Sequence, residues 1–449
     1  MLNPRPALRV LLVASHLKRR TGMVLHVRDL ALALLRSGHT PIVYSLYRGE
    51  IADELRHASV AVPESLAHVQ DVPDIIHGHT QLETMAAALT FPGTPVVATC
   101  HGFVSWKNAA PPLFPRLRRY IAVDGACADR LRLECAIPDA RISLELNFVD
   151  LRRFPLREPL PARPARAAVF TNDQQHPYID VIVAACRTRG IAVEFIGGRG
   201  HQTDDPGAAL RPFDLVFATG RAALEGMAVG LAVILAGREG LGPMVTTDNF
   251  DMLRPLNFGL RNLRAPVDAD AVYAALDAFD ARDARLVSER LRWEADLDTA
   301  AAQMVVLYRA VIDEHSASRV DQAQELRVAG AYLEHVHQMY RDRIRAETAA
   351  AALDAKARFE RRSTKHRQNV LAKIAKARAS ARRSRESELQ MGQAVDSLKR
   401  AVAEMGHGAH DLRKALARTE AQVEALRSAL DATRRGGWVG RLWRRAARR

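Results

Sequence analysis

The sequence predicts an α/β protein with two domains of similar size, followed by a long all-helical extension. Short apolar runs alternate with amphipathic helical segments through residues 1–155 and again through residues 168–316. A Pro- and Arg-rich segment, residues 156–167, separates the two series, and prolines there forbid regular strand pairing. From about residue 300 onward the pattern is helical throughout.

The first series begins with residues 8–14, LRVLLVA, an apolar run typical of a strand buried on both faces. A loop containing Gly22 follows, then an amphipathic helix that ends at Gly38, then a strand over residues 40–46. This β–loop–α–β order is the unit of a parallel, doubly wound sheet. Further strands are predicted in the segments PDIIHGH, PVVATCHGF and RYIAVDG. Residues 1–155 therefore predict a Rossmann-like domain.

The second series predicts another Rossmann-like domain over residues 168–316. Its expected strands lie in AAVFT, IAVEFIG, FDLVFAT and LAVIL, and its helices at about 178–188 and 221–229. Two such domains joined by a short linker create a cleft that faces the carboxyl ends of both sheets, where α/β sheets bind ligands.

The basic charge of the chain is confined to its C-terminal part. The whole chain has a net charge of +14, but residues 319–449 hold 30 Lys and Arg against 15 Asp and Glu. The preceding residues are close to neutral, so the high pI says nothing about the predicted cleft. The four cysteines show no metal or CxxC spacing, which favours buried thiols and a reducing compartment. The N-terminus leads directly into a strand and no apolar run is long enough to span a membrane, so we expect a cytoplasmic protein.

The extension divides into three parts by composition. Residues 317–390 are a basic helical region, in which positions 356–385 hold twelve Lys and Arg against one Glu. Residues 391–432 predict a coiled coil, because eleven of the twelve positions in an uninterrupted 4–3 spacing from 391 to 430 are apolar. Residues 433–449 combine tryptophans with arginines, a pattern that suits an anionic membrane surface. Another polyanion, or a tail that binds nothing, remains an alternative.

The stretch ATGRAALEGMAVGLAVI, residues 218–234, is the most informative part of the second domain. Gly220 permits a tight turn at a helix start, where unpaired N–H groups and the helix dipole favour an anion. One acid, Glu225, lies inside the otherwise apolar helix, where its carboxylate can accept hydrogen bonds from sugar hydroxyls. Both features suit a nucleotide sugar. The alternative is a βα unit whose Glu merely reaches solvent.

Five stretches of the sequence, and the order in which they occur, resemble the retaining glycosyltransferase family 4. Members of that family have the GT-B fold, and many of them build bacterial surface polysaccharides. The stretches are RTGMVLHVRDLALALLRSGH, PDIIHGHT, PVVATCHGF, IPDARISLELNFVDLRRF and GRAALEGMAVGLAVI. The resemblance as a whole covers residues 8 to about 315. The resemblance implies a GT-B architecture of two Rossmann-like domains, with the acceptor side in the first domain and the nucleotide-sugar side in the second.

Individual residues inherit roles from this resemblance. Glu225 aligns with the second acid of the family's E-x7-E motif and would bind the nucleotide ribose. Gly220 and Arg221 stand where the family binds the donor phosphates or sugar, and Gly22 stands in the loop that approaches the diphosphate. His101 aligns with the histidine that contacts the transferred sugar near the reacting centre, so it is the expected catalytic residue.

Three departures from the family pattern bear on turnover. The first acid of the motif is replaced by Phe217, and the Gly–Gly loop is reduced to Gly22–Met23. The basic pair expected after the first strand of the second domain is absent, and residues 172–176, NDQQH, stand there instead. A departing diphosphate needs positive charge, so Arg221 or Arg199 would have to supply it.

We therefore expect a glycosyltransferase that moves a sugar from a nucleoside-diphosphate sugar to a glycan or lipid-linked acceptor in bacterial surface polysaccharide synthesis. The alternative is a catalytically degenerate GT-B-like scaffold or nucleotide-binding module that recruits partners through its coiled coil. We expect homo-oligomers through residues 391–430, peripheral contact with the inner face of the plasma membrane through the basic tail, and no role in nucleic-acid binding. No cofactor is expected, and no metal at His77 and His79, because no acid or cysteine companion is evident.

Overall fold

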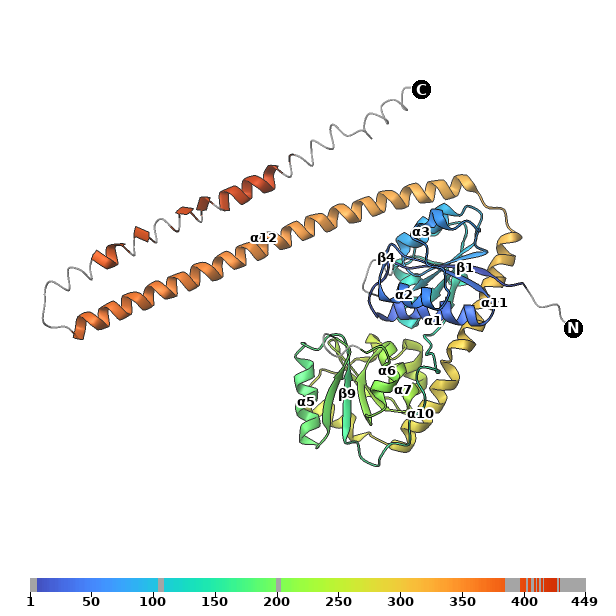
Figure 1. Cartoon of the computed structure of the whole chain (residues 1–449), viewed down its shortest axis with the longest axis horizontal. Coiled ribbons are helices and arrows are strands. Elements are labelled where there is room, and N and C mark those ends of the chain that lie inside the picture. The colour runs from blue at the N-terminus through green and yellow to red at the C-terminus, as the bar shows by residue number, and fades with distance from the viewer. Residues whose placement is uncertain are drawn as a thin grey trace, which may run out of the picture. The chain divides into compact units, whose positions relative to one another are not determined.

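A computed structural model describes residues 6–103, 109–198 and 203–383, together with residues 396–400, 403–404, 408, 410–411, 413–414, 416–425 and 428 (Figure 1). The chain divides into two compact units, Met1–His335 and Val336–Arg449. The first unit contains both predicted α/β domains, and the candidate site lies entirely within it.

The first domain is built on a six-stranded parallel sheet of order β3-β1-β5-β6-β7-β8. Its strands are β1 (Arg9–Val13), β3 (Thr40–Tyr44), β5 (Ile75–Gly78), β6 (Val96–Cys100), β7 (Leu117–Ala122) and β8 (Ile142–Leu144). The apolar runs that predicted β1, β5 and β6 are buried on both faces, as in other parallel sheets, whereas the edge strand β8 was not predicted and is partly exposed. The short strands β2 (His16–Leu17) and β4 (Tyr47–Arg48) form a separate parallel pair.

Helices cover this sheet. They are α1 (Gly22–Arg36), α2 (Glu50–His57), α3 (Gln81–Thr90) and α4 (Gly125–Asp129), with shorter turns at Leu66–His68, Arg130–Glu134 and Asp139–Arg141. Helix α3 approaches β5 so closely that a Cβ atom on Gly78 would lie 1.9 Å from the hydroxyl oxygen of Thr84. Only glycine fits there, which explains the small residue between His77 and His79.

The second domain contains a five-stranded sheet of order β10-β9-β11-β12-β13, in which only β13 runs antiparallel. Its strands are β9 (Arg166–Phe170), β10 (Ala192–Ile196), β11 (Leu215–Ala218), β12 (Ala232–Gly237) and β13 (Gly240–Met244). The helices are α5 (Tyr178–Thr188), α6 (Pro206–Leu210), α7 (Gly220–Val229), α8 (Phe250–Leu253), α9 (Ala269–Asp277) and α10 (Ala281–Glu294), with 3-10 turns at Arg254–Leu256 and Leu260–Asn262. The predicted pair of Rossmann-like domains is thus confirmed.

Helix α11 (Leu297–Ser316) corrects the predicted domain boundary. We placed the second domain at residues 168–316, but α11 packs on α1, and its Leu297, Met304 and Tyr308 belong to the core of the first domain (Figure 1). Its apolar face therefore completes the first domain although it follows the second in sequence. The linker also ends slightly earlier than predicted, because β9 begins at Arg166.

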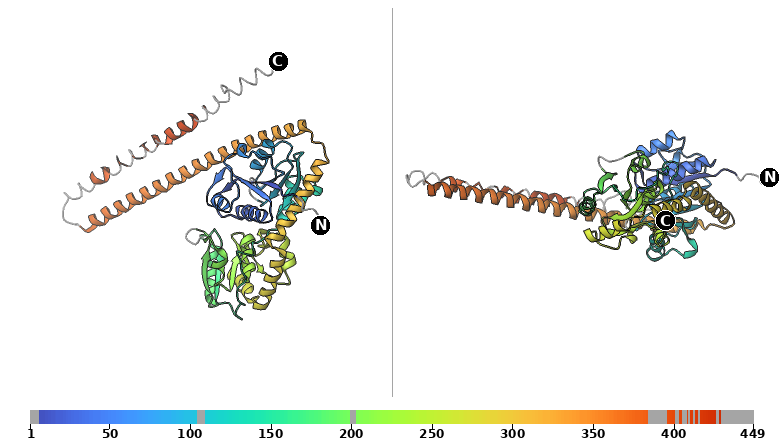
Figure 2. Two further views of the ribbon diagram at one scale, coloured as in Figure 1. Left: turned by 45° about the vertical axis from the view of Figure 1, so that its right-hand side comes forward. Right: turned by 90° about the horizontal axis from the view of Figure 1, so that it is seen from below.

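Helix α12 (Gln322–Arg383) begins within the first unit and continues into the second, and both views of Figure 2 show it as one continuous helix. Its first turns bury Glu325, Ala329 and Tyr332. We predicted a separate basic helical region that begins at residue 317. The structure instead shows that the first turns of α12 belong to the globular unit. Parts of the predicted coiled coil, residues 391–432, and all of the tail 433–449 lie outside the described residues, and the described residues of the coil are helical.

Two further sequence expectations bear on the environment of the protein. None of the four cysteines, all of which are described, forms a disulfide; Cys100, Cys127 and Cys186 are buried and Cys135 is partly buried, as expected for structural thiols. Within the described residues, no helix combines the length and the apolar character needed to cross a membrane.

Candidate active site

The carboxyl ends of both sheets meet at one cavity of about 470 Å³. In each sheet the first strand of the domain lies between the second and the third, so the strand order reverses direction at β1/β5 and at β9/β11. Such switch points form the ligand crevices of doubly wound sheets. The cavity is lined by residues of both domains, among them the predicted Gly22, His101, Gly220 and Arg221. Four of the six predicted site residues therefore come together.

Two helices begin at this cavity. Gly22 is the first residue of α1 and Gly220 the first of α7, and both line the cavity. The residues before them, Thr21 and Thr219, make no side-chain capping hydrogen bond to the described part of the chain. Amides in the first turn of a helix lack partners within the helix, and the helix dipole adds partial positive charge. The cavity thus adjoins two helix N-termini, which are positions that favour anions.

Gly220 itself adopts the left-handed region, with φ +56°. Its amide donates a hydrogen bond of 2.9 Å to the carbonyl oxygen of Phe258. Phe258 and the preceding Asn257 are themselves left-handed, with φ of 52° and 48°, although neither is glycine. Such conformations cost energy and tend to occur at functional sites.

Asn257 lines the cavity and ties the second domain to the first. Its side chain donates to the carbonyl oxygen of Val123 and accepts a hydrogen bond of 3.2 Å from the amide of Asn147. Buried Arg254 donates to both the side chain of Asn257, at 2.6 Å, and the carbonyl oxygen of Asn147, at 2.9 Å. Sequence reasoning missed these polar residues. The only signal was an Asn two positions before a Gly, which is too common to single out.

Arg221 lies at the cavity but holds two carboxylates. Its guanidinium donates to Glu225 Oε1 at 2.7 Å, one turn along α7, and to Asp29 Oδ2 on α1 of the other domain. Asp29 also accepts from Arg28 Nε at 2.8 Å. Arg28, Asp29, Arg221 and Glu225 thus form a buried interdomain ion network, and Arg28 extends it to the partly exposed Glu54 at 3.2 Å.

Burial and charge shift the protonation of this network. Burial alone would raise the pKa of Asp29, but the charges and hydrogen bonds of Arg221 and Arg28 outweigh it and lower that pKa. Burial raises the pKa of Glu225, and Arg221 offsets this only in part. The two carboxylates together raise the pKa of Arg221 against the effect of its burial. Arg221 therefore stays charged at the cavity.

Glu225 does not line the cavity in this structure. Its side chain is 5% exposed and is bound by Arg221. The predicted ribose contact stays a prediction, and it requires Arg221 to release the carboxylate. Arg199 lies outside the described residues.

Phe217, at the position of the missing acid, packs in the core of the second domain. The loop that lacks the basic pair has a structural use instead. The Asn172 side chain accepts a hydrogen bond of 3.1 Å from the Gly198 amide, and Gln174 donates to the carbonyl oxygen of Gly197. These contacts hold a two-glycine turn in place, but they bring no positive charge to the cavity.

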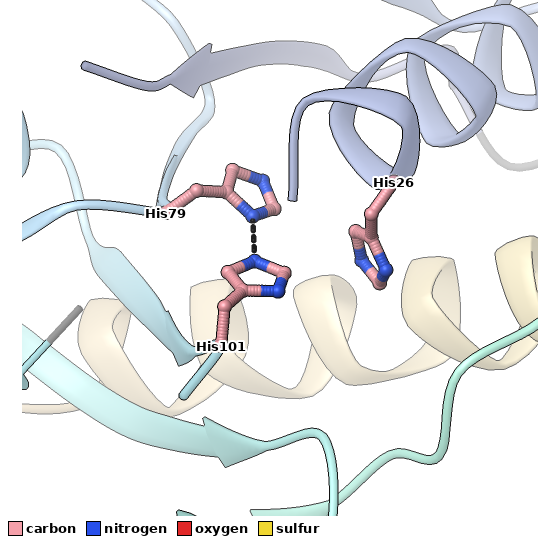
Figure 3. A group of neighbouring side chains, drawn as sticks. All are labelled: His26, His79 and His101. Carbon is pink, nitrogen blue, oxygen red and sulfur yellow. Dashed lines mark hydrogen bonds between the residues drawn. The ribbon is translucent and has the colours of Figure 1, made fainter. Parts of the chain in front are cut away.

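His101, which is partly exposed, lies beside the buried imidazoles of His26 and His79 at the carboxyl edge of the first sheet (Figure 3). It follows β6 and its Nε2 lies 2.8 Å from Nδ1 of His79, which follows β5. His26, on α1, stands opposite both rings, at centroid distances of 4.9 Å from His101 and 5.7 Å from His79. Burial lowers the pKa of His101 well below its ordinary value, with a further contribution from His26, so His101 is neutral at pH 7.

Comparison with known proteins agrees with this architecture. Residues 20–153 match the family model described as Glycosyltransferase Family 4. A search of curated proteins found no match. Among solved structures, the chain is similar to a glycosyltransferase from Rickettsia africae ESF-5, with 13% identity, a TM-score of 0.50, and coverage of 68% of this chain and 99% of that one.

Two further structures show weaker likeness. Anabaena Alr3699/HepE in complex with UDP-glucose has 15% identity and a TM-score of 0.49, with coverage of 68% of this chain and 100% of that one. Sucrose-phosphate synthase from Thermosynechococcus elongatus has 16% identity and a TM-score of 0.47 at the same coverage. The chain therefore has the GT-B fold of glycosyltransferases, and its first domain matches glycosyltransferase family 4.

Proposed function

We propose that this protein is a glycosyltransferase that transfers a sugar from a nucleoside-diphosphate sugar to a glycan or lipid-linked acceptor. One observation carries the proposal. Two glycine-first helices, α1 and α7, begin at one interdomain cavity that also holds Arg221 and His101. The family match over residues 20–153 supports the same chemistry.

The diphosphate suits the space between Gly22 and Gly220. A Cβ atom built on either glycine meets no other heavy atom within 4 Å, so each backbone is open to a ligand. Two helix N-termini and the Arg221 guanidinium offer fixed positive charge to an anion. The same groups would stabilise the diphosphate as the bond between it and the sugar anomeric carbon breaks and a bond to the acceptor hydroxyl oxygen forms. The acceptor proton would leave with the diphosphate.

His101 suits the sugar end of this ligand. Its ring is oriented by the 2.8 Å contact with His79, and it reaches the cavity from the end of β6. Because it is neutral, it can offer either a donor N–H or a lone pair to a sugar hydroxyl without adding charge. Retention of configuration is the outcome that the family resemblance implies.

Donor binding would rearrange the ion network. We propose that Arg221 turns from Glu225 toward the diphosphate and leaves the Glu225 carboxylate to the ribose hydroxyls. Asp29 keeps Arg28 as a partner, with a hydrogen bond of 2.6 Å from Nη2. Every buried charge would then retain a hydrogen-bonding partner, which the cost of unpaired buried charges requires.

A second candidate is a nucleotide-binding scaffold without turnover. Two observations favour it: Phe217 fills the core where the family has an acid, and the loop at Asn172–Gln174 is not basic. In either case we propose that residues 391–430 form homo-oligomers and that the basic tail holds the protein at the inner face of the plasma membrane. Surface polysaccharide synthesis is the process we propose for it.

The proposal is tested by calorimetric binding of a panel of UDP- and GDP-sugars, followed by transfer and hydrolysis assays. Gly22→Ala would place a methyl group in the open space at the start of α1. It should weaken donor binding at least tenfold without changing the melting temperature. Gly330→Ala is the matched control, because a Cβ there also meets nothing within 4 Å and α12 lies away from the cavity.

The outcomes separate the two candidates. Binding with transfer supports the enzyme, and binding without transfer or hydrolysis supports the scaffold. If no nucleotide sugar binds the wild-type protein, or if Gly22→Ala binds as tightly as Gly330→Ala, the assigned cavity is wrong.

A further inference from the structure

Three histidines from separate elements converge beside the cavity. His26 lies on α1, His79 follows β5 and His101 follows β6, and each ring offers one nitrogen so that the three atoms lie within 4.8 Å of one another (Figure 3). Two of the side chains are almost fully buried, with exposures of 5% for His26 and 0% for His79. His101 is partly exposed and lines the cavity.

The hydrogen bonds leave two nitrogens of these three rings without partners. A neutral imidazole has one N–H donor and one lone pair. The contact between His79 Nδ1 and His101 Nε2, at 2.8 Å, uses one nitrogen of each ring. The Nε2 atoms of His26 and His79 are buried and make no hydrogen bond within the part of the chain that the structure describes. Buried polar atoms normally have partners, so these two call for an explanation.

His77 provides the contrast. It lies one strand position before Gly78 and is equally buried, but its Nδ1 contacts the Tyr308 hydroxyl at 2.6 Å and its Nε2 contacts the Thr99 hydroxyl at 2.6 Å. A histidine that serves only the packing of this region therefore has both nitrogens satisfied.

We propose that His26, His79 and His101 form a binding site for a divalent transition metal of the zinc class. Three imidazoles with one open position are a common zinc-binding set, and imidazole nitrogen suits zinc, cobalt and nickel. Because His101 also lines the cavity, water or a ligand oxygen from the cavity would complete the coordination. The sequence suggested no metal because it showed only the pair His77 and His79; the fold supplies the companions from α1 and β6.

The surroundings fit this ligand set. The side chain of Asn147 hydrogen-bonds His26, which fixes the orientation of that ring. Arg221 acts electrostatically on His26 and opposes a cation there, but its guanidinium is held in ion pairs with Asp29 and Glu225.

The site does not depend on the proposed function, because its direct readout is metal binding and not sugar transfer. The untagged full-length protein is stripped with a chelator, and its folding is checked by circular dichroism. It is then titrated with Zn²⁺ in a calorimeter and with Co²⁺ in a visible spectrometer. We expect one ion per chain and the intense visible bands of four-coordinate cobalt.

Single variants locate the ion. His26→Gln, His79→Gln and His101→Gln should each weaken Zn²⁺ binding at least about a hundredfold and abolish the cobalt bands, because each removes a ligand. The partly exposed His101 is the substitution least disturbing to the core. His57→Gln, at an exposed histidine ending α2, is the matched control and should bind as the wild type does.

The proposal is overturned if the folded wild-type protein binds no stoichiometric Zn²⁺ and shows no four-coordinate cobalt spectrum. It is equally overturned if His101→Gln binds Zn²⁺ as tightly as His57→Gln, because the ion would then be held elsewhere.

Discussion

The guanidinium of Arg221 on α7 donates to the carboxylate of Asp29 on α1, and this ion pair joins the two domains beside the interdomain cavity. Both side chains are largely buried, and each has a second partner of opposite charge in its own domain, Glu225 for Arg221 and Arg28 for Asp29. The contact therefore couples the arrangement of the domains to the position of the cation that we assign to the diphosphate.

A double-mutant cycle should show that this coupling is strong. Arg221→Gln leaves two buried carboxylates with too little positive charge and should cost about 3–5 kcal/mol of the free energy of unfolding. Combined with Asp29→Asn, the cost should fall short of the sum of the single variants by at least about 1 kcal/mol. Denaturant unfolding measures both. The solvent-exposed pair Arg285–Glu289 on α10 is the control, with an expected coupling of about 0.5 kcal/mol or less. If the losses of unfolding free energy in Arg221→Gln and Asp29→Asn simply add in the double variant, the two side chains are not coupled.

The role of Glu225 can be tested without disturbing the packing. Glu225→Gln keeps the shape of the side chain and a carbonyl oxygen for Arg221, so the protein should remain folded. It loses the charged acceptor for two ribose hydroxyls, and nucleotide affinity should fall at least tenfold, or about 1.4 kcal/mol. Calorimetry with UDP and GDP measures the change. Glu194→Gln, at an exposed ion pair with Arg166, is the control. Unchanged nucleotide affinity in Glu225→Gln would remove the ribose assignment.

The fold was predictable because its determinants are local. Runs such as Leu8–Ala14 specify strands buried on both faces, and the alternation with amphipathic helices specifies parallel sheets. The alternation also places the strand ends at one edge, which is why Gly22, His101, Gly220 and Arg221 were found together at the cavity.

The sequence does not predict which residues or helices far apart in the chain contact one another. The destination of α11 depends on which core lacks an apolar face, and its pattern alone is equally compatible with either domain. The ion pair between Arg221 and Asp29 spans 192 positions, and the sequence contains many other charges that could have met. His26 appeared to be one more polar residue on an amphipathic helix. Only the fold brings it to His79 and His101.

Acid should destabilise the protein through its buried histidines. Burial, with a smaller effect of His101, lowers the pKa of His77 from 6.5 to about 3. Between these values the unfolded chain binds a proton that the folded chain does not, so stability falls as the pH falls from 6.5 toward 3. The loss is up to about 1.4 kcal/mol per pH unit for each such group.

His77→Gln should flatten this dependence. The free energy of unfolding is measured by denaturant titration between about pH 6 and about pH 4, the window set by the lowered pKa, and in the presence of a chelator. His57→Gln controls for the loss of one histidine. A slope for His77→Gln equal to that of the wild type would show that His77 titrates alike in the folded and unfolded states.

The start of α12 is part of the globular unit, and its removal should be costly. Arg116 is 1% exposed and donates to the carbonyl oxygens of Ala88, Phe91 and Thr94 at 2.7 to 2.9 Å. Its charge is balanced by Glu325 on α12, at 2.7 Å from Nε. Glu325→Ala leaves the guanidinium buried without a counter-charge, which should cost about 3–5 kcal/mol. Glu334→Ala, at an exposed position of the same helix, should change stability by less than about 0.5 kcal/mol.

The same contact decides where the extension can be removed. Deleting residues 336–449 keeps Glu325 and Tyr332, so the melting temperature and nucleotide affinity should match those of the full chain. Deleting residues 319–449 removes both and should lower the melting temperature by several degrees, since each kcal/mol is worth roughly 2–4 °C in a domain of this size. Equal melting temperatures for the two truncations would show that the buried pair of Arg116 and Glu325 contributes nothing, because the longer deletion differs from the shorter one in residues 319–335 alone.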